Sequence, residues 1–179
     1  DFTLDIPNDD MLWLLKASIT PHRARQMGIG YSEYYRRIIL PIYKDGKLVY
    51  FQARKLHDDQ DIKYINPSVD RSAIGYWVIP EGADKSRIIV TEDILSAIRV
   101  GYHVPAMSAL GTKLSIPLAN QLSEYKHVTT WLDPDEAGIQ GARDMRKLIG
   151  LTTPTSNIAT DKDPKDYCDE DIAYYLSRR

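Results

Sequence analysis

Cysteine is almost missing from this sequence: Cys168 is the only one in 179 residues. A single cysteine can neither close a disulfide within the chain nor build the cysteine-rich ligand sets of structural zinc sites. The histidines do not replace it, because they are scattered without the spacing of metal ligands. They are His22, His57, His103 and His127. We therefore expect no zinc site within this chain.

Long apolar runs are also missing. No stretch approaches the roughly 18 residues that cross a membrane, and we expect no signal peptide. We expect a protein without membrane contact that works in the cytoplasm. Because the sequence starts at Asp1 rather than at Met, we also expect it to be a fragment of a longer protein.

Net charge is small, with a formal value of −2, but it is unevenly distributed. From Thr20 to Lys55 there are eight basic and two acidic residues, a net of +6. From Glu81 to the end there are fifteen acidic and twelve basic residues, a net of −3. This division suits a polyanion-binding region beside a metal-binding region, although two ordinary solvated surfaces would also explain it.

The first region, residues 1–80, is predicted to combine helices with an antiparallel sheet. Helices are expected over 8–18 and 21–27, the second with Thr20 as its N-cap and Pro21 at its first position. Strands are expected over 37–43 and 47–55, because Asp45-Gly46 between two apolar runs is a strong hairpin signal.

The second region, residues 81–179, alternates strand and helix. Strands are expected over 87–91, 104–109, 127–132 and 157–160, and helices over 94–100, 116–124, 137–149 and 169–177. Strands separated by single helices indicate right-handed crossovers and a parallel sheet. The predicted fold class is therefore α/β, preceded by a mixed α+β region.

Acidic residues follow three of these strands. Glu92 follows the first, Asp133 and Asp135 the third, and Asp163 and Asp166 the fourth. Since ligands bind beyond the carboxyl ends of parallel strands, these carboxylates are expected to converge. Clustered carboxylates without thiolate or imidazole ligands favour Mg²⁺ or Mn²⁺, which support phosphoryl or nucleotidyl transfer.

A purely structural interpretation is also available. In the segment Asp133-Pro134-Asp135-Glu136, Asp133 would cap a helix that begins at Pro134. Asp163-Pro164 would likewise be an ordinary turn. The coincidence of three acidic strand ends, rather than any one of them, favours the metal site.

These segments resemble the motifs of Toprim domains. The segment 87–92 with its following helix resembles the glutamate motif, and 131–138 with the small residues after it resembles the Asp-x-Asp motif. Ala109–Thr112 resembles the small-residue segment between the two, and 161–166 the third acidic motif.

The first region resembles bacterial and phage DNA primases in the order of its segments. These are Gly28–Tyr31, Ile38–Pro41, Phe51–Arg54 and Lys63–Pro67. The resemblance extends from about Ile19 to Tyr167. It implies a Toprim-type parallel sheet flanked by helices over 81–179, preceded by a basic subdomain that faces template and nucleotide.

The resemblance implies a nucleotidyltransferase that makes short RNA primers from ribonucleoside triphosphates on a single-stranded DNA template. It further implies a replicative helicase as partner and a zinc-binding module that this chain lacks.

The implied catalytic residues are Glu92, Asp133 and Asp135, and the implied ligands of Mg²⁺ or Mn²⁺ are Glu92, Asp133, Asp135 and Asp163. The implied nucleotide- or primer-binding residues are Arg54 and Lys63, and weaker template-binding candidates are Arg23, Arg25, Arg36 and Arg37. Without the motif, Lys63 would be a solvated lysine beside the acidic run 58–61.

Two departures from the family pattern concern the metal site. Asp93 stands where the glutamate motif usually has Gly, and Ser96 stands where primases often have another Asp. Either Asp93 compensates as a metal ligand or as a group behind the ligands, or one metal site is weakened, so the number of bound metal ions stays open. Asp163 is preferred as the fourth ligand, with Asp93 as its rival. Two other functions also remain open, a Toprim nuclease of the overcoming-lysogenization-defect type and a non-catalytic module that binds single-stranded DNA or a helicase.

Overall fold

The computed structural model describes residues 2–178, and the chain divides into two compact units, Asp1–Arg71 and Ser72–Arg179. The division falls after Arg71 and not between residues 80 and 81 as the sequence suggested. The reason is that strand β5 (Tyr76–Val78) pairs with β7 (Ala106–Ser108), which belongs to the second unit.

The first unit begins with two short helices, α1 (Asn8–Lys16) and α2 (Pro21–Gln26). The hydroxyl of Thr20 accepts a hydrogen bond from the amide of Arg23 at 3.3 Å, which is the expected N-cap. Gly28 follows α2 with a φ of +68°, a left-handed conformation that glycine adopts without strain. The chain can therefore turn directly from α2 into the sheet.

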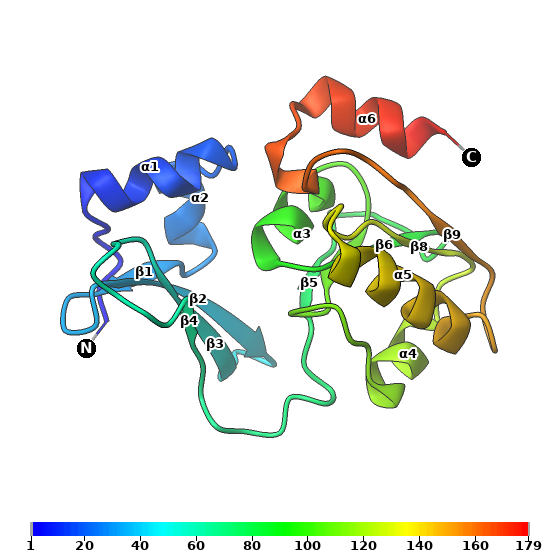
Figure 1. Ribbon diagram of the computed structural model, residues 1–179, viewed down its shortest axis with the longest axis horizontal. Coiled ribbons are helices and arrows are strands. Elements are labelled where there is room, and N and C mark those ends of the chain that lie inside the picture. The colour runs from blue at the N-terminus through cyan, green and yellow to red at the C-terminus, as the bar shows by residue number, and fades with distance from the viewer. Residues whose placement is uncertain (1, 179) are drawn as a thin grey trace. The chain divides into compact units, whose positions relative to one another are not determined.

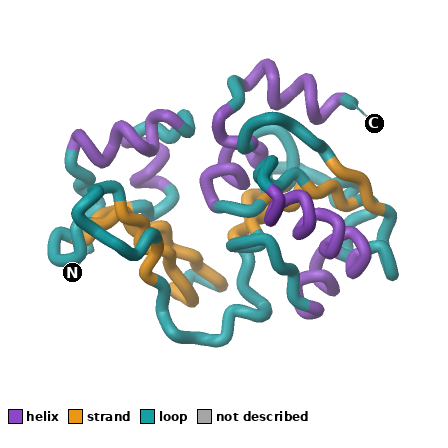
Figure 2. The backbone as a smooth tube through the Cα atoms, viewed as in Figure 1, coloured by secondary structure: helices purple, strands orange, loops and turns teal. Residues whose placement is uncertain are grey.

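The first unit contains four strands, drawn in orange in Figure 2: β1 (Gly30–Ser32), β2 (Arg37–Lys44), β3 (Lys47–Lys55) and β4 (Tyr64–Ile65). They form an antiparallel sheet of order β1-β2-β3-β4. The tight turn between β2 and β3 has positive φ at Asp45 and Gly46, as the predicted hairpin requires. The last residues of β3 pair with β4, and Arg54 lies opposite Tyr64 in this pairing.

The second unit contains a five-stranded sheet of order β5-β7-β6-β8-β9. Its further strands are β6 (Ile88–Thr91), β8 (Val128–Thr130) and β9 (Thr155–Asn157). Only the edge strand β5 is antiparallel among these described strands, and the four others are parallel. This is the α/β architecture with a parallel-rich sheet that the sequence predicted.

Helices cover both faces of this sheet (Figure 1). The helices are α3 (Ile94–Gly101), α4 (Ile116–Leu122), α5 (Glu136–Ile149) and α6 (Asp169–Ser177), with a 3₁₀ turn η1 (Pro164–Asp166) before the last. Ile88 and Val90 pack against α4 and α5, whereas Ile89 lies in the opposite cluster with α3 and α6. All four residues of β6 are buried, which explains its unbroken apolar run.

The structure corrects two local details. The purely structural interpretation of Asp133 is wrong, because Asp135 caps α5 and the helix begins at Glu136, close to the predicted start at residue 137. Strand β9 lies earlier in the sequence than the predicted strand 157–160. Within residues 2–178, no helix has the length and apolar character needed to cross a membrane.

Candidate functional site

The acidic residues lie at the carboxyl edge of the second sheet. Glu92 directly follows β6, Asp133 follows the neighbouring β8, and Asp163 lies on the loop after β9. Because β6, β8 and β9 are adjacent and parallel, these three chain segments leave the sheet at the same edge. The structure therefore brings the sequence-predicted carboxylates into one cluster.

Backbone contacts hold Glu92 in place. Its carbonyl oxygen accepts hydrogen bonds from the Ser108 hydroxyl and the Gly111 amide, both at 2.9 Å. Gly111 has a φ of +140°, which only glycine adopts readily, and Leu110 before it is also left-handed. The small-residue segment Ala109–Thr112 is thus a turn that is hydrogen-bonded to the residue directly after β6.

Gly138 places Asp133 close to the start of α5. A Cβ atom on Gly138 would lie 2.1 Å from the carbonyl oxygen of Asp133, so no larger residue fits without a shift. The carboxylate of Asp135 accepts a hydrogen bond from the Gly138 amide at 2.7 Å. Asp133 therefore lies at the end of the segment after β8, and Asp135, two residues later, caps the helix α5 that packs against it.

The loop that carries Asp163 is tied to the sheet by aromatic and basic side chains. The indole of the fully buried Trp131 donates a hydrogen bond to the Thr160 hydroxyl at 2.9 Å. Arg99, which is also buried, donates to the carbonyl oxygen of Tyr167 at 2.8 Å. These contacts fix both ends of the third acidic motif.

Two further charged residues join the cluster: Asp93, which the sequence offered as an alternative ligand, and Lys165, which was not predicted. Asp93 caps α3, and its carboxylate accepts hydrogen bonds from the amides of Leu95 and Ser96 at 2.9 and 3.1 Å. The ammonium group of Lys165 lies 3.1 Å from Asp93 and 2.5 Å from Asp163. Nothing in the sequence distinguished Lys165 from Lys162, the other lysine of the third acidic motif.

Burial and mutual repulsion raise the pKa values of Glu92 and Asp133. Desolvation is the main cause for Glu92, followed by the negative charges of Asp135, Asp93 and Asp163. Desolvation also dominates for Asp133 and, with the neighbouring carboxylates, raises its pKa to about 7 despite the opposing effect of Lys165.

The same neighbours act in the opposite sense on the lysine. Burial lowers the pKa of Lys165, but the carboxylates of Asp93, Asp163 and Asp133 more than offset this, and the net pKa is raised. The cluster therefore holds more negative charge than its one ammonium group neutralises.

The chemistry of the cluster fits a hard divalent cation. One oxygen each of Glu92 and Asp133 is buried and has no hydrogen-bond partner among the described residues. An unpartnered buried carboxylate oxygen is costly unless a cation reaches it. No three Asp, Glu, His or Cys side chains within residues 2–178 are already arranged as a metal site, and Lys165 lies between two of the carboxylates.

In the first unit, Arg54 lies between two aromatic rings. Its guanidinium is 5.6 Å from the ring centroid of Trp13 and 5.1 Å from that of Tyr64. Its Nε and Nη1 atoms are buried without an acceptor in the described part of the chain. Lys63 is exposed, with its ammonium 5.8 Å from the Tyr64 ring. Arg54 thus has hydrogen-bond donors that a phosphate would satisfy.

The weaker template candidates have different surroundings. Arg37 is buried and donates to the carbonyl oxygens of Ile62, Lys63 and Ala53, so the structure gives it a structural role instead of a surface position. Exposed ion pairs join Arg36 to Asp59 and Arg25 to Asp5. Arg23 is exposed on α2.

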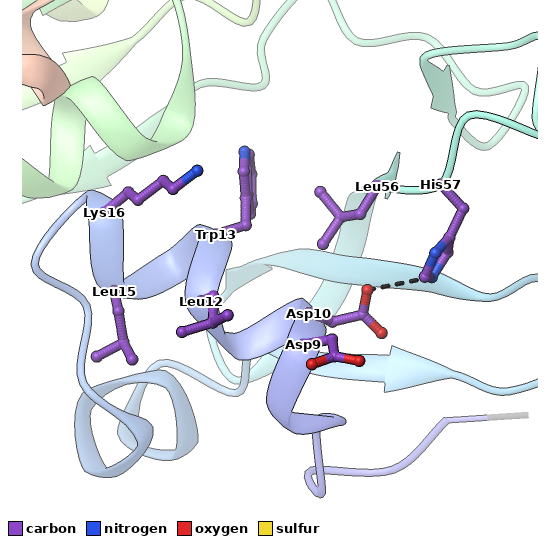
Figure 3. A pocket seen from close by; sticks show the side chains of 8 residues that line it. All are labelled: Asp9, Asp10, Leu12, Trp13, Leu15, Lys16, Leu56 and His57. Carbon is purple, nitrogen blue, oxygen red and sulfur yellow. Dashed lines mark ion pairs between the residues drawn. The ribbon is translucent and has the colours of Figure 1, made fainter.

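A hollow of about 640 Å³ lies beside α1 (Figure 3). Trp13 and Lys16 project from one side of the helix, and Leu12 and Leu15 from the other (Figure 3). His57 lies 3.2 Å from the buried carboxylate of Asp10, which connects the segment after β3 to α1. Sequence reasoning did not identify this hollow, since its lining comes from two separate segments.

Comparisons with known proteins agree with these features. A family model described as Toprim-like matches residues 90–168, which include the acidic cluster up to Lys165. No curated protein matches the sequence.

Several solved structures resemble the fold, and three of them are primase domains or fragments from different sources. The Aquifex aeolicus primase (zinc-binding and RNA polymerase domains) has a TM-score of 0.80 at 19% identity, over 95% of this chain and 55% of that one. A DNA primase domain from Pseudomonas aeruginosa has a TM-score of 0.75 at 16% identity, over 96% and 72%. The primase fragment of the bacteriophage T7 primase-helicase protein has a TM-score of 0.65 at 13% identity, over 98% and 73%. The chain thus spans about half the length of the Aquifex structure.

Proposed function

We propose a primer-synthesising function for this chain on the premise that it is a Toprim-containing protein with the fold of bacterial and phage DNA primase domains. The proposed activity is metal-dependent synthesis of short RNA primers from ribonucleoside triphosphates on single-stranded DNA. The observation that carries it is the cluster at the carboxyl edge of the second sheet, where Glu92 and Asp133 each bury an oxygen without a partner in the described structure.

In this proposal Glu92, Asp133 and Asp135 would hold Mg²⁺ or Mn²⁺, with Asp163 as a further candidate ligand. A bound divalent cation would supply positive charge for the triphosphate and for the negative charge that develops during nucleotidyl transfer. Glu92, with its raised pKa, would either complete the ligand set or accept the proton of the attacking 3′-hydroxyl. The turn at Ser108 and Gly111 would keep its carboxylate at the reacting centre.

The first unit would bind the nucleotide or the nascent primer. Arg54 is supported by its unpartnered donors and by the two rings that restrict its guanidinium. Lys63 would add a compact charge beside the same Tyr64 ring. Of the proposed template contacts, Arg23, Arg25 and Arg36 remain on the surface, and Arg37 would act indirectly by holding the backbone of Lys63.

Further partners belong to the same proposal. The Aquifex structure includes a zinc-binding domain and the T7 protein is a primase-helicase, so we propose a zinc-binding module and a replicative helicase as partners. The corresponding location would be the cytoplasm of a bacterial cell or of a phage-infected host.

The test is primer synthesis from ribonucleoside triphosphates on random single-stranded DNA, with and without a supplied zinc-binding module. We expect Mg²⁺- or Mn²⁺-dependent products, lost in Asp133→Ala and kept in Asp144→Ala, an exposed acidic residue on α5. Products made equally well by Asp133→Ala would refute the assignment. Cleavage of labelled DNA instead of synthesis would identify a nuclease, and template binding without either reaction would identify a non-catalytic module.

A further inference from the structure

Lys165 provides a positive charge inside the acidic cluster. Its ammonium lies 2.5 Å from a carboxylate oxygen of Asp163 and 3.1 Å from one of Asp93. The side chains of all three residues are mostly buried, with 21–27% of their surface exposed. A lysine on the surface could leave its partners at little cost, whereas this one is held where separation would leave carboxylates buried without a counter-charge.

The carboxylate of Asp93 is fully engaged. One oxygen accepts the two backbone amides at the start of α3, from Leu95 and Ser96. The other accepts the Ser96 hydroxyl at 2.7 Å and the ammonium of Lys165. A carboxylate has about four acceptor positions, so Asp93 has none left for a metal ion.

In contrast to Asp93, the carboxylates of Glu92 and Asp133 still have acceptor positions without a hydrogen-bond donor in the described structure. One such oxygen on each of the two side chains is buried. The cluster is therefore divided into Asp93 and Asp163, which Lys165 neutralises, and Glu92 and Asp133, which still lack a cation.

The loop of Lys165 is also held rigidly enough to maintain this division. The 3₁₀ turn η1 follows Asp163, and its amide at Asp166 donates to the Asp163 carbonyl at 3.0 Å. The next residue, Tyr167, is tied to Arg99 through its carbonyl oxygen and to Asp161 through its hydroxyl.

We propose that the ammonium of Lys165 takes the place of one divalent ion, so that the chain binds a single divalent cation, at Glu92 and Asp133. This inference rests on the proposed function, because it concerns the same metal site. It assigns to Lys165 a positioning role: the lysine removes Asp93 and Asp163 from the ligand set and keeps a permanent positive charge beside the bound ion.

The experiment is titration of the full chain with Mn²⁺, with free Mn²⁺ measured by electron paramagnetic resonance. We expect one ion per chain for the wild type and two for Lys165→Met, which frees Asp93 and Asp163. The matched control is Lys162→Met, an exposed lysine in the same loop, which should still bind one. Adding Asp93→Asn to Lys165→Met should return the number to one.

The outcomes separate this inference from the proposed function. Two ions in the wild type, or one in a folded Lys165→Met, would overturn the inference and leave the proposed function standing. No bound ion in the wild type would overturn both. One ion without any primer synthesis would support the inference and count against the proposed function. Two ions in the wild type would overturn the inference even if Lys165→Met does not fold.

Discussion

Replacing Asp133 by asparagine should stabilise the metal-free protein, although it removes a proposed metal ligand. Burial and the neighbouring carboxylates raise the pKa of Asp133 to about 7, from an ordinary value of 3.8. The ionised form is therefore less stable in the folded protein than in the unfolded chain. An asparagine side chain has a similar shape but never ionises, so the Asp133→Asn variant avoids this cost.

The size of the effect follows from the pKa. One pKa unit corresponds to about 1.4 kcal/mol, so a rise from 3.8 to about 7 is worth at most about 4 kcal/mol. Because Asp133 is partly exposed, solvent screening reduces this to roughly 1–3 kcal/mol.

The sign depends on pH. Below about pH 4, Asp133 is protonated in both states and costs nothing. As the pH rises towards 7, the unfolded chain releases the proton and the folded protein keeps it, so the wild type steadily loses stability. Above about pH 7 the cost is complete.

Urea denaturation in EDTA at a series of pH values measures this difference. The advantage of Asp133→Asn should grow between about pH 4 and 7 and then level off. Saturating Mn²⁺ should reverse the order, because only the wild type gains binding energy. Asp144→Asn on the exposed side of α5 should stay within about 0.5 kcal/mol of the wild type. A metal-free variant less stable than the wild type at every pH would refute the reasoning.

Three further predictions concern groups around the site. Gly138→Ala should weaken Mn²⁺ binding and destabilise the protein by about 1–3 kcal/mol, since its Cβ would press on the Asp133 carbonyl; unchanged binding in a titration would contradict this. Trp131→Phe should cost about 2–3 kcal/mol in urea denaturation, because the fully buried site loses both ring volume and the hydrogen bond to Thr160; a Thr160→Val background should remove only the hydrogen-bond part, about 1 kcal/mol. Arg54→Lys should weaken binding of a ribonucleoside triphosphate about tenfold in a fluorescence titration, because lysine lacks the planar donor set; equal affinity would remove Arg54 from the proposed nucleotide site.

Much of the fold could be predicted from the sequence because its signals are local. The Thr20 cap, the Asp45-Gly46 turn and the apolar run of β6 each depend on neighbouring residues and standard backbone geometry. The short strands β1, β4 and β5 were missed, because strands of two or three residues have too little periodicity to recognise.

The acidic residues after the strands could likewise be predicted as a group, since parallel strands bring their carboxyl ends to one edge. Their individual roles could not. Whether Asp133 or Asp135 caps α5 depends on how closely the helix approaches β8, and that approach is limited by contact between Gly138 and a backbone carbonyl.

By itself, the sequence determined the α/β class, the order of the elements and the acidic edge of the second sheet. Only the tertiary structure decided that Arg37 is buried, that Arg54 lies between two rings, and that Lys165 neutralises Asp93. The physical reason is distance along the chain: Lys165 and Asp93 are 72 residues apart, and no local pattern specifies such a pair. Packing of the β9–α6 segment against α3 brings them together and so sets the charge balance of the proposed metal site.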